Sequence, residues 1–141
     1  MKSLTFIEIL FVIILLGILT AVGVPQAKKT FESLELNSFS REFQGFMNYL
    51  SERAVVLQEP ITLYFKQEER IAWAEAGEEE DKVKLKAIKI PEGIELSSEK
   101  EAVVFSPDGR IDKVSIKLTN KNSQTVTLTT KGIVSGVKIE K

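Results

Sequence analysis

The chain begins with an apolar stretch that is long enough to cross a membrane. No charged residue occurs from position 9 to 24, and Glu8 carries the only charge between Lys2 and Lys28. A helix needs about 20 apolar residues to span the hydrocarbon core of a bilayer. Lys2 precedes the stretch, and basic residues tend to stay on the cytoplasmic side of a membrane. The pattern predicts a single-pass helix with the rest of the chain on the outer side.

The pattern then changes to that of an amphipathic helix over residues 26–58. Apolar side chains recur in steps of three and four, which places them on one face of a helix, with polar side chains opposite. Glu59-Pro60 ends the helix because a residue before proline is biased out of helical geometry. Joined to the apolar stretch, it makes one helix of roughly 55 residues, on the order of 80 Å long. The apolar face, expected to pack on a sheet, consists of Leu36, Phe39, Phe43, Phe46, Met47, Leu50, Ala54 and Leu57.

After Pro60 the hydrophobic period drops to two, which is the period of β-strands. Short polar turns separate the alternating segments, and connections this short join antiparallel strands. In residues 82–90 the alternation slips by one position after Leu85, which predicts a β-bulge or the end of a strand. SPDGR, at residues 106–110, has the Pro, Asp and Gly of a tight turn. The expected strands are residues 61–65, 70–74, 82–90, 94–96, 102–105, 113–119, 124–130 and 133–139.

The composition argues against an enzyme. The 141 residues include no cysteine and no histidine, and the formal net charge is −1. The absence of these two residue types removes thiol nucleophiles, disulfides, the usual zinc ligands and the commonest general base. The mixed charges create no overall field that would attract nucleic acid. We expect no catalytic residue, no cofactor and no metal site.

Two acidic features raise the question of calcium. The segment EAGEEED occupies residues 75–81, and Asp108 lies in the SPDGR turn. Calcium takes roughly six to eight oxygen ligands around one point, and no such cluster surrounds Asp108 in the sequence. We interpret residues 75–81 as a solvated loop between strands and Asp108 as part of a hairpin turn.

Glu8 makes the apolar stretch unusual, because an acid facing lipid costs on the order of 2–3 kcal/mol near a helix centre. A cleavable signal peptide, cut near residues 19–21, is one interpretation. Such peptides carry positive charge at the edge of the apolar region, whereas this chain carries an acid. A plain signal anchor is a second interpretation, and it leaves Glu8 unexplained unless the carboxylate reaches the membrane edge.

A third interpretation rests on a resemblance. The segment LTFIEILFVIILLGILTAVGVP, which starts at Leu4, resembles the N-terminal segment of type IV pilins and type II secretion pseudopilins. In that family a short basic leader precedes an apolar helix that has Thr second, Glu fifth, a Gly in its middle and a Pro near its end. Four residues of this chain fall at the family's spacing: Thr5, Glu8, Gly17 and Pro25.

The resemblance implies processing of the N-terminus. Residues 1–3 would be a leader that a prepilin peptidase removes by cleavage between Ser3 and Leu4, followed by N-methylation of Leu4. The family has Gly before the cleavage site, and this chain has Ser3. The first mature residue would be Leu4 in place of the usual Phe.

The resemblance also implies assembly roles for Thr5, Glu8, Gly17 and Pro25. Cleavage would create a positive amine on Leu4, which would meet the Glu8 carboxylate of its own or a neighbouring subunit in a filament. An unpaired buried charge is costly, so this pair would fix subunit register. Pro25 lacks a backbone donor and is expected to kink or loosen the helix nearby. The resemblance implies melting between Gly17 and Pro25 in the filament, and close helix contact at these small residues is the alternative.

The sheet region carries a second resemblance. The helix end LSERAVVLQEPITLYF and the later segments VVFSPDGR, KVSIKL, TVTLTT and KGIVSGVKI are similar to H-type minor pseudopilins of the GspH/FimT family. The resemblance implies an α+β, pilin-like fold, in which a long N-terminal helix packs on a C-terminal antiparallel β domain. Its divisions would be leader 1–3, transmembrane and filament-core helix 4–25, amphipathic helix 26–58 and β domain 59–141.

The implied function is that of a minor pseudopilin, a structural subunit of the type II secretion pseudopilus that assembles through its N-terminal helix and supports protein export. Its partners would be other minor and major pseudopilins, the prepilin peptidase and inner-membrane lipid. The chain would cross the bacterial inner membrane once, with a periplasmic or otherwise extracytoplasmic C-terminal domain.

Two alternatives remain open. One is a minor pilin of a type IV pilus or DNA-uptake pilus, and the other is a signal-anchored enzyme or ligand sensor. No nucleic-acid partner is expected, because the basic residues near the C-terminus are few: Lys131, Lys138 and Lys141. The lone Trp73 is expected in the core rather than on a surface where bases could stack.

Overall fold

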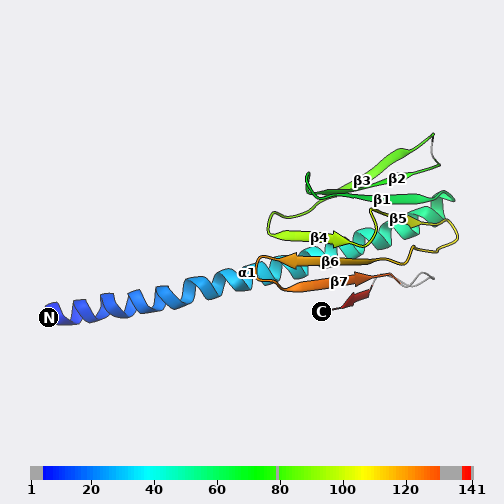
Figure 1. The fold of residues 1–141 in the computed structure, drawn as a ribbon. Helices are drawn as coiled ribbons and strands as arrows, with labels where there is room; N and C mark the ends of the chain where they lie inside the picture. The colour runs from blue at the N-terminus through cyan, green and yellow to red at the C-terminus, as the bar shows by residue number, and fades with distance from the viewer. Residues whose placement is uncertain (1–4, 79, 131–137, 141) are drawn as a thin grey trace.

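The computed structural model describes residues 5–78, 80–130 and 138–140. In these ranges a long N-terminal helix is followed by strands only (Figure 1). The last predicted strand, 133–139, overlaps β8, and its residues 133–137 lie outside the described residues. The elements are α1 (Phe6–Leu57), β1 (Ile61–Lys66), β2 (Ile71–Ala76), β3 (Val83–Lys89), β4 (Ile94–Ser98), β5 (Ala102–Phe105), β6 (Ser115–Asn120), β7 (Thr125–Thr129) and β8 (Lys138–Glu140).

Helix α1 contains both the apolar stretch and the amphipathic segment that packs on the sheets. Its 52 residues give a length of about 78 Å at the usual rise per residue. The N-terminal half extends away from the sheets, and the C-terminal half lies against them (Figure 1). The helix ends at Gln58, which adopts a left-handed conformation with φ 55° and donates its N–H to the Val55 carbonyl. Glu59 and Pro60 then lead into β1, as the sequence predicts.

Pro25 does not interrupt α1. The helix runs through this position without a break, although proline removes one backbone donor and crowds the carbonyl four residues earlier. The flanking helix on both sides keeps this segment helical in the single subunit, and the kink or loosening expected nearby stays a prediction. The melting between Gly17 and Pro25 concerned an assembled filament and stays a prediction.

The strands form two antiparallel sheets with four strands each. The first has the order β3-β2-β1-β5, and the second has the order β4-β6-β7-β8. Hairpins account for most neighbours, but β1 also pairs with β5, which brings Leu63 opposite Val103 from a distant part of the chain. The sequence predicted antiparallel pairing and did not indicate the division into two sheets.

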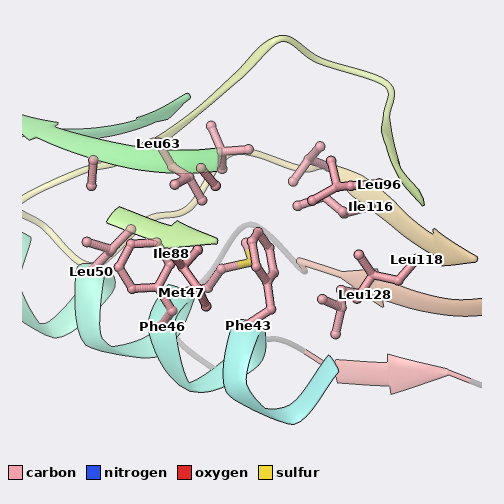
Figure 2. Packing of buried hydrophobic residues seen from close by; sticks show 14 of the residues in the cluster. Phe43, Phe46, Met47, Leu50, Leu63, Ile88, Leu96, Ile116, Leu118 and Leu128 are labelled. Carbon is pink, nitrogen blue, oxygen red and sulfur yellow. The ribbon is translucent and has the colours of Figure 1, made fainter. Parts of the chain in front are cut away.

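The core lies between α1 and the inner faces of both sheets (Figure 2). The Phe43 side chain is fully buried, with ring centroids 5.8 Å from Phe39 and 6.2 Å from Phe65. Full burial of one such side chain contributes about 1.5–3 kcal/mol. The predicted apolar face is confirmed, since Leu57 packs on the core and its other members are buried: Leu36, Phe39, Phe43, Phe46, Met47, Leu50 and Ala54.

The slip in alternation near Leu85 is a bulge in β3. Ala74 of β2 lies opposite Lys86, but the next residue, Glu75, lies opposite Lys84. Leu85 is therefore an extra residue without a partner on β2, which is how a bulge shifts the faces of a strand. The bulge predicted from the sequence is confirmed.

Trp73 corrects an expectation, because it is not in the core. In β2 the buried residues are Ala72, Ala74 and Ala76, so Trp73 points to the opposite face of the sheet and is only half-buried. Its ring stacks on Tyr64 of β1 at 5.5 Å between centroids, and its Nε1 donates to Glu75. A large apolar side chain in an alternating strand can be stabilised by a cross-strand neighbour as well as by the core.

Candidate assembly interface

The N-terminal half of α1 presents an uncovered apolar surface. Among the described residues, α1 is the one helix long and apolar enough to cross a membrane, and no part of its apolar window is buried inside the chain. Phe6 is 84% exposed and Leu19 is 62% exposed. Contiguous apolar surface of this size is unfavourable in water and marks contact with lipid or with other proteins. The helix therefore fits a single-pass membrane anchor.

Glu8 lies in the first turn of this helix. Thr5 is the N-cap residue, and its carbonyl accepts from the N–H groups of Glu8 and Ile9 at 3.0 and 3.2 Å. A carboxylate in the first turn interacts favourably with the positive end of the helix dipole. Within the part of the chain that the structure describes, Glu8 is exposed and forms no ion pair. Its charge is thus available to a group outside the described residues.

Thr5 and Glu8 also have the spacing of a capping box, a relation that the sequence analysis missed. Thr5 is at the N-cap and Glu8 is three residues later, where a Glu side chain can reach back to the N-cap N–H. The Thr5 hydroxyl makes no capping hydrogen bond. The signal was the Thr-x-x-Glu pattern before an apolar run. Ser3 and Leu4, the predicted processing residues, lie outside the described residues.

Small and polar residues inside the apolar half leave its surface accessible to a neighbouring helix. A Cβ atom added at Gly17 or Gly23 would meet no heavy atom of the chain within 4 Å. The Thr20 hydroxyl donates to the carbonyls of Leu16 and Gly17 at 3.0 Å, so it is satisfied within the helix. Small residues on a membrane helix allow close packing of a second helix.

A shallow groove of about 930 Å³ marks the junction between the apolar half and the sheets. Phe31 is 71% exposed and Leu34 is 59% exposed beside it. Across the groove, an added Cβ at Gly93 would lie 2.9 Å from a carboxylate oxygen at the end of the exposed, flexible Glu35 side chain of α1. The exposed apolar surface thus continues past the span, along the side of the helix that leaves the domain.

The acidic segment at residues 75–81 lies only partly in a loop, because Glu75 and Ala76 belong to β2 and Ala76 is buried. Residues 77, 78, 80 and 81 connect β2 to β3, and Gly77 has a positive φ of 110°. In the SPDGR turn, the Asp108 carboxylate accepts from the Arg110 N–H at 3.2 Å and forms an ion pair with its side chain at 3.0 Å. The described residues contain no cluster of three or more acidic side chains that could hold a metal ion.

Comparisons with known proteins identify the class of fold. No protein-family model matches the chain, and no curated protein matches it in sequence. Among solved structures, the chain is similar to the minor pseudopilin EpsH from the Type 2 Secretion System of Vibrio cholerae, with a TM-score of 0.63 and 12% sequence identity. The match covers 75% of this chain and 96% of that chain. At this identity the similarity concerns the fold, and the predicted α+β, pilin-like fold is confirmed.

Proposed function

We propose that this chain is a minor pseudopilin, a structural subunit of a type II secretion pseudopilus. The observation that carries the proposal is the combination of an exposed apolar helix half, with an acid in its first turn, and a sheet domain with the fold of EpsH. The apolar half anchors the subunit in the bacterial inner membrane before assembly and enters the filament core afterwards. The sheet domain lies on the periplasmic side, and the partners are other major and minor pseudopilins.

Processing is part of this proposal. The prepilin peptidase cleaves between Ser3 and Leu4, and Leu4 is then N-methylated. Leu4 directly precedes the N-cap residue Thr5. A new amine at Leu4 therefore carries its positive charge close to the first turn, where Glu8 lies. Burial of the carboxylate in a filament without such a partner is strongly unfavourable, so the pair selects one register.

Mass spectrometry of the mature N-terminus tests the processing step. The chain is purified from the membranes of the producing cell and digested, and the first peptide is identified. The proposal expects a peptide that begins at Leu4 with one added methyl group on its amine. An intact Met1, or cleavage near residues 19–21, contradicts it.

The Glu8→Leu variant tests assembly. It retains the apolar length and should insert in the membrane as the original chain does, because removal of a charge makes insertion easier. We expect co-purification with other pilin-like subunits from membranes to fall about tenfold or more, since the neighbour's amine is left buried without a counter-charge.

Glu52→Leu is the matched control, because Glu52 is an exposed glutamate on the domain half of the same helix. It should co-purify with the same partners at the original yield. Equal yields for the Glu8 and Glu52 variants would show that Glu8 has no role in assembly.

A further inference from the structure

Strand β3 has a free edge. In the described part of the chain it pairs with β2 on one side, and no strand lies on the other (Figure 1). Ile90 donates its N–H to the Arg70 carbonyl at 2.9 Å, toward β2. Because the direction alternates along an antiparallel ladder, the backbone groups of Ala87 and Lys89 point away from β2. Unpaired backbone groups of this kind can accept an additional strand.

The lysines on β3 determine which charge is favourable on a strand that pairs with its free edge. Lys84, Lys86 and Lys89 are exposed and take part in none of the ion pairs between described residues. Two copies of β3 side by side would bring lysines together, and like charges on neighbouring strands are destabilising. The edge therefore disfavours a second copy of this chain and favours a strand with acidic side chains.

A groove runs beside this edge. Its volume is about 400 Å³, and it lies between β3 and the middle of the domain half of α1, where Glu42, Phe46 and Tyr49 line it. On the β3 side, the Lys86 ammonium lies 5.6 Å from the centre of the Tyr49 ring. Glu42 repels a carboxylate at its end of the groove, so acidic side chains of a bound strand would lie toward the lysines.

Gly45 forms part of the helix wall of the same groove. A Cβ atom at this position would meet no heavy atom within 4 Å, so nothing inside the chain requires a glycine here. Glycine in a helix interior costs about 1 kcal/mol relative to alanine. The open space beside Gly45 can therefore accommodate a side chain of a bound partner.

From these features we propose that β3 binds an extended segment of a partner protein that has acidic side chains at alternate positions. The segment adds as a strand along residues 86–89, where the register with β2 is regular beyond the bulge. Successive side chains of a strand point to opposite faces, so its acidic side chains lie on the outer face of the sheet, which carries Lys89. An apolar side chain on the other face, beside Lys86, enters the groove over Gly45. The proposal depends on the sheet edge and is independent of the filament role.

Peptide binding to the full chain in lipid nanodiscs tests the proposal. The probe is a capped peptide of about eight residues with alternating glutamate and valine, and the control peptide alternates lysine and valine. Only the glutamate peptide should bind, because the lysines of β3 attract it and repel the control. Amide exchange measured by NMR should slow about tenfold or more at Ala87 and Lys89. The Ile88 amide, which already faces β2, should change little.

Two sets of charge reversals make the test specific. The triple variant Lys84→Glu, Lys86→Glu and Lys89→Glu should weaken the glutamate peptide about tenfold or more. The matched triple variant Lys113→Glu, Lys117→Glu and Lys121→Glu changes three exposed lysines outside β3 and should leave binding intact. Circular dichroism confirms that both variants keep the fold. Gly45→Leu, which fills the groove, should also weaken the glutamate peptide.

Four outcomes would overturn the proposal. They are failure of the glutamate peptide to bind, equal binding of both peptides, slowed exchange at amides outside β3, and binding of single-stranded oligothymidylate in place of the peptide. The last outcome would assign the lysines of β3 to a nucleic acid.

Discussion

Asn120 shows how single polar residues are accommodated in the core. Its side-chain oxygen accepts from the N–H groups of Asn122 and Gln124 at 3.0 Å, and its amide donates to the Gln124 side chain at 2.8 Å. These bonds organise the turn between β6 and β7. Among the described residues, no buried side-chain nitrogen or oxygen lacks a hydrogen-bond partner. The buried Asn120 side chain is therefore satisfied by the turn that it organises, as expected when an unsatisfied buried group is costly.

Replacement of Asn120 by alanine should destabilise the chain by about 1–3 kcal/mol, because two backbone N–H groups lose their acceptor. Urea unfolding in detergent micelles, followed by circular dichroism, measures the change. Asn120→Asp keeps an acceptor oxygen in place and should retain a larger share of the stability. Equal stability of the alanine variant and the original chain would show that water replaces the side chain at no cost.

The sequence predicts some side-chain positions better than others. Phe43 and its neighbours could be placed in the core because a helical period of apolar residues defines one face without knowledge of the partner. Trp73 could not, because an alternating strand has two faces and the sequence does not say which one is covered. Trp73 lies on the face of the sheet where it can stack on its cross-strand neighbour Tyr64. This pairing depends on the register of β1 and β2, which the local sequence does not specify.

At the scale of elements, α1 was predictable because all its determinants are local. The apolar run, the amphipathic period and Glu59-Pro60 together define a helix close to the observed Phe6–Leu57. The two-sheet arrangement was not predictable from local pattern. It depends on the pairing of β1 with β5, and long-range pairing follows from packing and chain entropy rather than from residues near each other in sequence.

Gly45→Ala is a prediction about the helix as an element. It should raise the free energy of unfolding by up to about 1 kcal/mol, because alanine has the higher helix propensity and its methyl group meets open space. Thermal unfolding followed by circular dichroism at 222 nm measures the shift.

Gly93→Ala is the comparison variant for this measurement, because its Cβ would lie 2.9 Å from Glu35. It should give no gain in stability. A stability decrease in the Gly45 variant would mean that the groove beside α1 closes in the free chain.

At the scale of the whole molecule, the core and the apolar half of α1 are separate. The first buried residue along the described helix is Leu36, and every residue from Thr5 to Phe31 is exposed. The folding of the domain thus rests on contacts that begin in the second half of the helix. The predicted processing residues, Ser3 and Leu4, precede the first described residue, Thr5.

A fragment that starts at Lys28 should therefore fold without the membrane. It retains every buried apolar residue of the described core and loses most of the exposed apolar surface of the N-terminal half of α1, of which Phe31 and Leu34 remain. Gel filtration should give a discrete small oligomer or a monomer. Circular dichroism should show a cooperative thermal transition. Aggregation with loss of β-sheet signal would indicate that the apolar half also supports the domain.

The unbroken passage of α1 through Pro25 has a mechanical consequence. Since one helix enters both the membrane-facing and the sheet-bearing parts, the first part cannot turn about its axis without carrying the second with it. Each residue of helix corresponds to a rotation of about 100° and an advance of about 1.5 Å. The number of residues between Glu8 and Leu36 thus determines the azimuth at which the sheets are displayed. Insertion or deletion of one residue in this part of the helix would therefore rotate the sheets by about 100° relative to the apolar half.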